Sequence, residues 1–391
     1  MIKKNIHVLI AGPRLSNDKI KFRRRRLAEY LSKKKETKKV FWIYFKPDNL
    51  FSFGKIRFID KEKNDTIQQV EISDFKYVIA NSRHLQKRLT TKIKVLLSDY
   101  ENCEHYLWFT LPRFSRLANL KWAKIIYDCS DFWGGQYSMV SFTKYFRAKS
   151  VLKSEKQITT NSDICFASSE FLYQYMLQFS SNVHLIENGV DYVHFSQCKE
   201  TANELKKLNG PILGFTGDML PLKISFDLIF YIATKEPKWN IILVGPAENP
   251  MLTKTKFYEL IRLPNVHYFN FVEFEMVPSY IMGFDVALLP YKNADFNNGV
   301  FPLKFFEYLA VGKVIVGTGL PATKKYVEDG VYHYADTPQD FLTKCRLAIK
   351  LNNNNIIKRK EMALKADWTK KLSNLYVLVF NLKEESNETK I

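Results

Sequence analysis

The sequence predicts an α/β fold with two Rossmann-like domains, each built on a doubly wound parallel sheet. Its 391 residues are too many for one ordinary hydrophobic core and suit two. Short runs of β-branched and aromatic residues alternate with longer amphipathic stretches, which is typical of parallel βα units. This alternation stops once, in a polar segment from Tyr192 to Gly210, and then begins again.

Seven short apolar runs are the candidate strands of the first sheet. They lie at His7–Ala11, Val40–Phe45, Tyr77–Ala80, Tyr106–Phe109, Lys124–Asp128, Ile164–Ala167 and Val183–Ile186. The run nearest the N-terminus is too short for a secretory signal core and lacks a small-residue cleavage pattern, so a strand explains it better.

The polar segment ends in Asn209-Gly210-Pro211, a strong turn signal. We therefore predict a first domain over residues 1–190, a linker over 191–210 and a second domain over 211–365. The strands expected in the second sheet are Ile212–Thr216, Asn240–Val244, Val266–Phe269, Val286–Leu289 and Val314–Val316.

Residues 366–391 contain a predicted C-terminal helix. Four apolar residues recur there at spacings that place them on one face, namely Trp368, Leu372, Leu375 and Val379. A helix with such a face needs a surface on which to dock.

The composition excludes several protein classes. No stretch approaches the ~20 consecutive apolar residues of a membrane helix, so we place the protein in the cytoplasm. Its five cysteines are scattered and include no C-x-x-C pair, which argues against a zinc site and against a disulfide framework.

The net charge of +19 is unevenly distributed, because residues 1–60 hold 11 Lys and 6 Arg against 5 acidic residues. Such a surface can bind nucleic acid, anionic lipid head groups or a polyanionic substrate, and composition does not choose between them. A set of solvated surface lysines explains any single position equally well.

The most informative segment runs from Asn298 to Val316 and reads as a turn, a helix, a stop and a strand. Pro302 suits the first position of a helix, and Gly312 suits the position just past its end. The helix start is therefore well defined.

The start of this helix is a candidate site for a pyrophosphate. The backbone N–H groups of Leu303 and Lys304 have no partner within the helix, and the Lys304 side chain adds a full positive charge. Glu307 lies one turn further on, where its carboxylate can accept hydrogen bonds from ribose hydroxyls. A solvent-exposed Glu307 paired with Lys304 explains that position equally well.

This segment resembles the nucleotide-sugar motif of the retaining family 4 glycosyltransferases, in the form P-L-K-x-x-E-Y-L-A-x-G-K. Other segments resemble the same family in the same order along the chain. They are Glu187-Asn188-Gly189-Val190-Asp191, Gly214-Phe215-Thr216-Gly217 followed by Lys223, Phe284-Asp285-Val286-Ala287-Leu288-Leu289-Pro290-Tyr291, and Asp367-Trp368.

The resemblance implies a GT-B fold, in which two Rossmann-like domains face each other across a cleft. It implies that the second domain binds a nucleotide-sugar through Gly217, Lys223, Pro302, Leu303, Lys304 and Glu307. Lys223 and Lys304 would stabilise the departing diphosphate, with no metal and no other cofactor. The resemblance further implies a uridine diphosphate donor, retention of configuration, and a C-terminal helix that crosses back to the first domain.

Three more segments resemble, more narrowly, the teichuronic-acid-type glycosyltransferases of Gram-positive bacteria. They are Asp18 to Ala28, Leu107-Trp108-Phe109-Thr110-Leu111-Pro112 and Tyr127-Asp128-Cys129-Ser130-Asp131-Phe132-Trp133. This likeness implies a cell-surface polysaccharide or a glycan linked to polyprenyl diphosphate as the acceptor. Together with the basic first domain, it implies peripheral binding at the anionic inner face of the cell membrane.

Two positions depart from the family pattern. Gly299 stands where the family has a Glu, and Asp218 stands where it has an Arg directly after the loop glycine. The first change removes a carboxylate expected near the sugar, and the second puts an acid near the expected phosphate site. Lys223 and Lys304 can still neutralise a diphosphate between them. A chain that has lost activity is the other interpretation.

Asp128 and Asp131 are candidates for a catalytic role on the acceptor side. Asp128 ends a predicted strand, at the edge where ligand sites of α/β sheets form, and two carboxylates alone are too few for a metal site. One of them would be the general base of an inverting enzyme, whereas in a retaining enzyme a phosphate oxygen of the donor can take the proton. Capping or ordering a turn explains either Asp equally well.

Arg14, Arg23 and Arg25 are the candidate acceptor-binding residues. The run Arg23 to Arg26 opens a predicted helix and spans one turn, so its side chains point in different directions. One or two of them could hold an acidic sugar or a lipid diphosphate. A solvated helix start is the alternative.

The predicted function is therefore sugar transfer from a nucleotide diphosphate donor to a surface glycan. Two other classes stay open: a nucleotide-sugar epimerase, for which no acid/base pair is evident, and a nucleic-acid-binding protein, for which no recognition element is evident. The predicted partners exclude nucleic acid.

Overall fold

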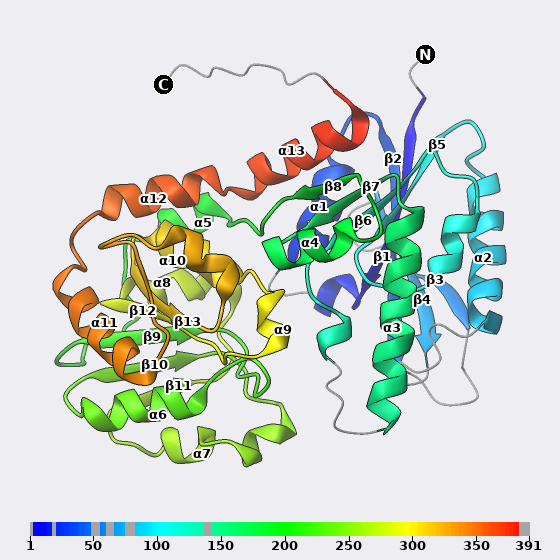
Figure 1. Ribbon diagram of the computed structural model, residues 1–391. Helices are drawn as coiled ribbons and strands as arrows, with labels where there is room; N and C mark the ends of the chain where they lie inside the picture. Colours follow the sequence, from blue (N-terminus) through cyan, green and yellow to red (C-terminus); the bar gives the residue numbers. More distant parts are fainter. Residues whose placement is uncertain are drawn as a thin grey trace, which may run out of the picture. The chain divides into compact units, whose positions relative to one another are not determined.

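The chain divides into two compact units (Figure 1). The computed structural model describes residues 3–17, 21–47, 55–59, 66–74, 83–136 and 142–382. The first unit consists of Met1–Glu187 and Leu372–Ile391, and the second of Asn188–Lys371. None of the described helices is long and apolar enough to cross a membrane.

The first unit is built on a sheet whose eight described strands are ordered β3-β4-β2-β1-β5-β6-β7-β8. All neighbouring strands are parallel except β3, which runs antiparallel to β4. Their bounds are β1 Asn5–Gly12, β2 Thr37–Pro47, β3 Ile56–Ile59, β4 Ile67–Asp74, β5 Glu104–Phe109, β6 Lys124–Cys129, β7 Ile164–Ala167 and β8 Val183–Leu185. The predicted strand Tyr77–Ala80 lies outside the described residues.

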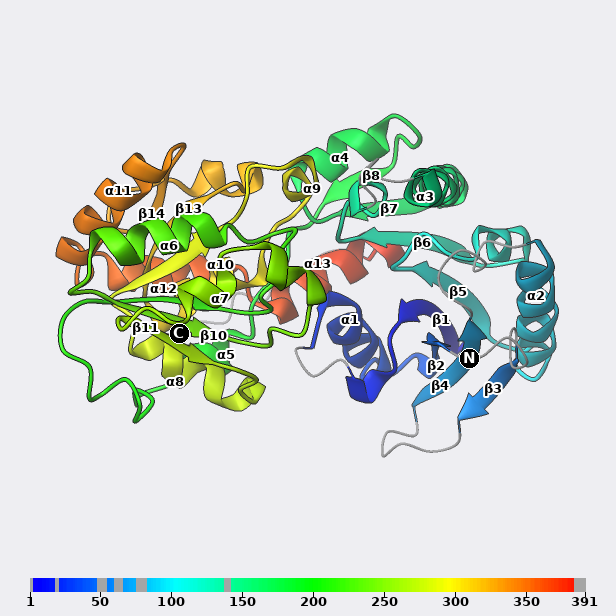
Figure 2. The same cartoon turned by 90° about the horizontal axis from the view of Figure 1, so that it is seen from below.

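Helices cover both faces of this sheet. Helix α1 (Arg23–Ser32) lies on one face, and α2 (Arg83–Ser98) and α3 (Phe142–Asn161) lie on the other (Figure 2). The short helix α4 (Glu170–Leu177) begins at Ser169, whose hydroxyl accepts a hydrogen bond from the Leu172 N–H. The core on the α2 side is continuous, with Leu89 and Ile93 of α2 packed against strand residues such as Val8.

The second unit contains a six-stranded, fully parallel sheet in the order β11-β10-β9-β12-β13-β14. Its strands are β9 Ile212–Thr216, β10 Asn240–Val244, β11 Val266–Phe269, β12 Val286–Pro290, β13 Val314–Thr318 and β14 Tyr332–Tyr334. Its helices are α5 Tyr192–Ser196, α6 Phe226–Lys235, α7 Phe257–Leu260, α8 Val277–Met282, α9 Asp295–Asn298, α10 Leu303–Val311, α11 Pro338–Lys350 and α12 Ile356–Lys365.

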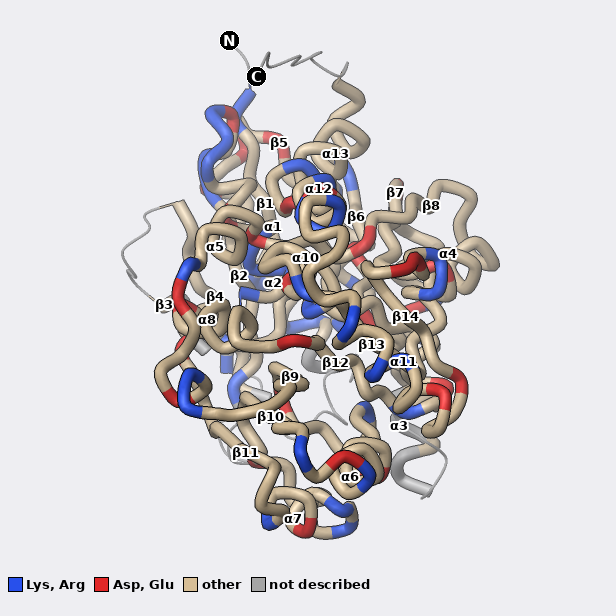
Figure 3. Tube along the Cα trace, turned by 90° about the vertical axis from the view of Figure 1, so that its left-hand side faces the viewer, with Lys and Arg blue, Asp and Glu red and all other residues tan. Residues whose placement is uncertain are grey.

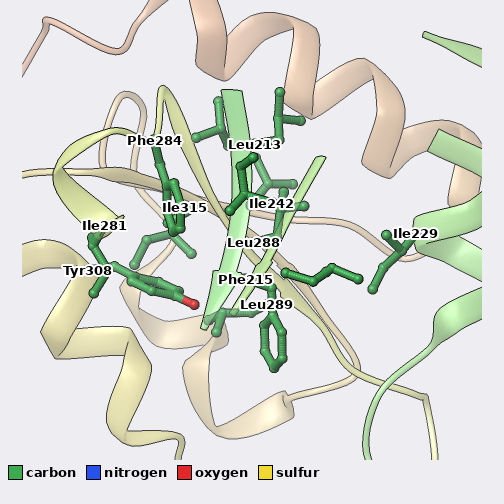
Figure 4. Close-up of a cluster of buried hydrophobic side chains, with 14 of the residues drawn as sticks. Leu213, Phe215, Ile229, Ile242, Ile281, Phe284, Leu288, Leu289, Tyr308 and Ile315 are labelled. Atoms are coloured by element: carbon green, nitrogen blue, oxygen red, sulfur yellow. The ribbon is translucent and has the colours of Figure 1, made fainter. Parts of the chain in front are cut away.

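The central strands β9 and β12 of the second unit are buried along their whole length, because helices cover both faces of the sheet. Figure 4 shows Leu213 and Phe215 of β9 packed near Ile242, Leu288 and other core side chains. The buried core of this unit fixes the sheet whose edge carries the candidate site.

The interpretation of residues 191–210 as a linker is corrected by the structure. This segment begins with α5, which is capped by the Asp191 carboxylate, and its apolar residues Phe195, Ala202 and Leu205 join the core of the second unit. Its polar composition concealed these few apolar anchors. The chain passes from the first unit to the second between Glu187 and Asn188 instead.

The C-terminal helix α13 (Trp368–Phe380) begins in the second unit, and from Leu372 onward it belongs to the first. Asp367 caps its start, where one carboxylate oxygen accepts a hydrogen bond from the Thr369 N–H at 2.8 Å. Further along, the Tyr376 hydroxyl donates to Glu36 Oε1 at 2.7 Å, and the Phe380 ring packs against Tyr106. The four residues of its predicted apolar face, Trp368, Leu372, Leu375 and Val379, are all buried.

Candidate functional site

The candidate donor site lies at the carboxyl ends of β9 and β12 in the second unit. From β9 the chain winds outward to β10 and β11, and then returns to place β12 on the other side of β9. Such a reversal of strand order leaves a crevice between the two loops that follow the strands. The loops here are residues 217–225 after β9 and residues 291–302 after β12.

Helix α10 begins at Leu303, one residue later than the sequence predicts. Pro302 flanks it in an extended conformation, with φ −76° and ψ 136°, and Gly312 ends it in the left-handed region at φ 87°. The Phe301 carbonyl accepts a hydrogen bond from the Asn188 side-chain amide at 2.8 Å, which fixes the approach to the helix. The first N–H groups of α10, including those of Leu303 and Lys304, have no partner within the helix.

The side chain of Lys304 lies against Gly217. A Cβ atom at Gly217 would stand 2.0 Å from Lys304 Cε and 2.4 Å from Nζ, and Gly217 has φ 132°. The Lys304 ammonium also lies 5.6 Å from the centre of the Phe215 ring. Glycine at position 217 therefore allows both this backbone conformation and the position of the lysine.

The charge of Lys304 is maintained by its surroundings. Burial lowers its pKa, but Tyr291, Glu307 and Asp218 together raise the pKa above its usual value. Lys304 is thus a protonated ammonium at the start of a helix. A phosphate placed there would meet this full charge and the helix N–H groups together.

Glu307 is half-buried on α10, and it is one of the groups that raise the pKa of Lys304. The predicted contact of Glu307 with ribose hydroxyls stays a prediction. The neighbouring Tyr308 is fully buried, and its hydroxyl accepts hydrogen bonds from the Thr216 N–H at 2.9 Å and from the Thr216 hydroxyl at 3.2 Å. This contact ties α10 to the end of β9, just before Gly217.

Lys223 lies in the loop after β9 and is half-buried. Its ammonium lies 4.9 Å from the centre of the Phe296 ring, and its backbone carbonyl accepts a hydrogen bond from the Lys292 N–H at 2.8 Å. Gly217 and Lys223 thus lie in the loop after β9, at the same edge of the second sheet as Lys304. Their shared role in binding the donor stays a prediction.

In the first unit, Arg23 and Asp128 bind each other. The Arg23 guanidinium donates from Nε to both carboxylate oxygens of Asp128 at 2.9 Å, and from Nη1 to the Ile186 carbonyl at 2.5 Å. The two side chains are only 4% and 1% exposed. This buried ion pair ties the start of α1 to the ends of β6 and β8.

The pairing changes how these two predicted site residues can act. Because Asp128 and Arg23 already neutralise each other, their geometry suits positioning of the sheet edge better than direct contact with an acceptor. Their predicted roles in catalysis and acceptor binding stay predictions. Asp131 follows in the next loop and is half-buried, and its carbonyl accepts a hydrogen bond from the Cys129 thiol at 3.5 Å.

Arg14 lies in the loop after β1, which other side chains hold in place. Trp42 donates to the Pro13 carbonyl at 2.8 Å, and Gln69 accepts from the Leu15 N–H at 3.0 Å. Arg25 donates to the Leu15 carbonyl at 3.1 Å, so it supports the loop that carries Arg14.

Arg25 also pairs with Glu29 of the same helix at 2.9 Å. The acceptor-binding roles of Arg14 and Arg25 stay predictions.

Comparison with known proteins decides the family. A sequence model of the family described as Glycosyl transferases group 1 matches residues 210–350. A Bacillus subtilis (strain 168) protein whose name describes it as the teichuronic acid biosynthesis glycosyltransferase TuaH is 34% identical over 385 residues, covering 93% of this chain and 94% of the relative. The chain belongs to the group 1 glycosyltransferases. It is thus an enzyme that transfers glycosyl groups.

Solved structures give this glycosyltransferase the GT-B fold. Sucrose-phosphate synthase from Thermosynechococcus elongatus has a TM-score of 0.71 at 13% identity, covering 97% of this chain and 100% of that chain. Anabaena HepE, solved in complex with UDP, has a TM-score of 0.70 at 14% identity with the same coverage. The relatives give no support to the epimerase or nucleic-acid-binding alternatives.

Sequence reasoning missed two residues that contact Lys223, namely Phe296 and Asn297 of α9. No charge or motif marks them, and only the fold brings them to the loop after β9. Within the described ranges, no three His, Cys, Asp or Glu side chains gather as a metal site would require. The expectation of chemistry without metal or other cofactor stays a prediction.

Proposed function

We propose that this glycosyltransferase moves a sugar from a UDP-sugar donor to a lipid-linked glycan that becomes cell-surface polysaccharide, with retention of configuration. The observation that carries the proposal is the Lys304 ammonium held against Gly217 at the start of α10. That arrangement suits a diphosphate, and HepE with the same fold was solved with UDP. The acceptor class follows from the TuaH relative, whose name refers to teichuronic acid.

In the proposed reaction, the bond between the sugar C1 and the diphosphate oxygen breaks, and its electron pair stays on the diphosphate. Lys304, Lys223 and the first N–H groups of α10 would stabilise the charge that develops there, more in the transition state than in the ground state. The acceptor hydroxyl oxygen bonds to C1, and its proton passes to an oxygen of the leaving diphosphate. Glu307 would hold the ribose.

The acceptor would be bound by the first unit. Arg14 and Asp131 are the proposed contacts, supported from behind by Arg25 and by the Arg23–Asp128 pair. An acidic sugar or a lipid diphosphate would complement the positive charge of Arg14.

The donor site can be tested by calorimetry with a panel of nucleoside diphosphates, without added metal. We expect micromolar binding of UDP to the wild type, weakened in both Lys304→Ala and Glu307→Ala. Lys358→Ala, on the exposed surface of α12, serves as the matched control. If no nucleoside diphosphate binds, or if Lys304→Ala binds UDP as well as the wild type, the proposed site is wrong.

We further propose that the first unit binds the anionic membrane surface through α2 and α3. The exposed basic side chains of these two helices are Lys87, Arg88, Lys92, Lys94, Lys149, Lys153 and Lys156. Figure 3 colours the Lys and Arg positions of the described chain blue. Neither helix has an acidic residue except Glu155, which is fully buried. Each basic residue near an anionic bilayer contributes roughly 1 kcal/mol.

Sedimentation with vesicles tests this surface. The wild type should bind vesicles that contain phosphatidylglycerol and not those of phosphatidylcholine alone, and Lys92→Glu with Lys153→Glu should abolish the binding. The same reversal at the exposed Lys206 and Lys207 of the second unit is the control. Equal loss in both double variants would contradict the proposal.

A further inference from the structure

The two loops of the donor site are joined by backbone hydrogen bonds. The Lys292 N–H donates to the Lys223 carbonyl, and the Ser225 N–H donates to the Pro290 carbonyl, each at 2.8 Å. The Lys292 ammonium also donates to the Pro221 carbonyl at 2.7 Å. These hydrogen bonds therefore fix the loop that carries Lys223 to the segment that follows β12.

Asn297 lies at the centre of this junction. It is fully buried, and its side-chain amide donates to the Lys223 carbonyl at 3.1 Å and to the Lys292 carbonyl at 2.7 Å. Both partners are carbonyl oxygens, so both require a donor, and the NH₂ group must face them. Asn297 thereby fixes the backbone of Lys223.

The residue before it, Phe296, contacts the other end of Lys223. The Lys223 ammonium lies 4.9 Å from the centre of the Phe296 ring, within the range of a cation–π interaction. Phe296 is half-buried and packs against the core of the second unit, so its ring has a fixed position. Two adjacent residues of α9 thus hold the backbone and the charged end of one lysine.

We infer that Phe296 and Asn297 are positioning residues that set where the Lys223 ammonium stands in the donor site. The same stretch of chain continues directly into α10, which carries Lys304. One continuous segment, residues 292–304, therefore determines the positions of both lysines. This inference rests on the proposed function, because it assigns the two residues a role through the binding of a diphosphate by Lys223.

A double-mutant cycle on UDP binding tests the inference. Phe296→Leu keeps an apolar side chain but removes the ring, and we expect it to weaken UDP binding by roughly 3- to 10-fold. In a Lys223→Met background, the same change should have no further effect, because the charge that the ring holds is gone. Phe296→Tyr keeps an aromatic ring and should bind UDP as tightly as the wild type does.

Phe230→Leu is the matched control. Its ring lies 4.6 Å from the ammonium of Lys256, a similar pair that involves neither loop of the donor site. This variant should bind UDP as the wild type does. Asn297→Ala should reduce the coupling between Phe296 and Lys223 in the same cycle, which a loss of stability alone would not do.

The outcomes separate this inference from the proposed function. If Lys223→Met binds UDP as tightly as the wild type, the proposed role of Lys223 is wrong, and the inference fails with it. If Lys223→Met weakens binding but Phe296→Leu does not, or if Phe296→Leu weakens it equally in both backgrounds, only the inference is overturned. Urea unfolding of each variant confirms that the compared proteins are folded.

Discussion

Gly217 and Lys304 occupy neighbouring space so closely that a methyl group at position 217 would stand 2.0 Å from Lys304 Cε. The two residues come from different loops, one after β9 and one at the start of α10. Lys304 can occupy its observed position only because the residue in the first loop, Gly217, has no side chain. The position of the Lys304 ammonium, the candidate phosphate-binding charge, therefore depends on a glycine at position 217.

Gly217→Ala should displace Lys304 and also strain the backbone, because φ is 132° at this position. We expect the free energy of unfolding to fall by about 1–3 kcal/mol and UDP binding to weaken as well. Urea unfolding and calorimetry measure the two effects. Gly330→Ala, at φ 67° and away from the site, is the control for strain alone. It should lose stability without loss of UDP affinity.

The buried pair of Arg23 and Asp128 should contribute to stability in proportion to its burial. Asp128→Asn leaves the guanidinium without its counter-charge inside the protein, which costs about 3–5 kcal/mol. Urea unfolding of the variant measures this loss. Glu29→Gln, which breaks the more exposed pair with Arg25, should cost less than about 1 kcal/mol. Equal costs in the two variants would contradict this account of Asp128.

Parts of the fold were predictable because strong local patterns encode them. The central strands β9 and β12 are short, mostly apolar and fully buried, and Gly312 does end α10. Strand β4 was missed because most of its residues are polar, so it does not stand out as an apolar run, although Gln69, Glu71 and Ser73 are buried. The three-residue strand β14 is too short to give a pattern.

The sequence predicted the lysines of the candidate site, but it did not predict which side chains contact one another. Lys223 and Lys304 fit a motif, but the pairing of Arg23 with Asp128 joins positions 105 residues apart. No local signal in a single sequence shows that two such charges neutralise each other. Phe296 and Asn297 resemble ordinary loop residues until the fold brings them to Lys223.

The buried Glu155 should make stability depend on pH. It accepts a hydrogen bond from the Tyr127 hydroxyl at 2.8 Å, and burial raises its pKa to about 7. The folded protein thus keeps a proton that the unfolded chain releases above pH 4.5. The stabilisation that this group contributes is fully present below pH 4.5 and is lost as the pH rises through 7. Between these values the free energy of unfolding falls by at most about 1.4 kcal/mol per pH unit.

Glu155→Gln should remove this dependence. Urea unfolding at pH 5 and pH 8 should give the variant a smaller loss of stability toward pH 8 than the wild type. His7, whose pKa is lowered to about 3 by burial, contributes an opposite slope equally in both proteins. The difference between wild type and variant therefore isolates Glu155. Parallel pH profiles would show that this carboxyl group is ionised in the folded state.

Asp218 should oppose donor binding, because its carboxylate is among the groups that raise the pKa of Lys304. A diphosphate must compete with the Asp218 carboxylate for the Lys304 ammonium, and the two negative groups also repel each other. Asp218→Asn keeps the size of the side chain and removes the charge, so we expect UDP to bind about 3- to 10-fold more tightly. Glu259→Gln, at an exposed position of α7, is the control for net charge and should leave the affinity unchanged. Weaker UDP binding by Asp218→Asn would instead assign Asp218 a direct contact with the donor, and calorimetry distinguishes the two by the sign of the change.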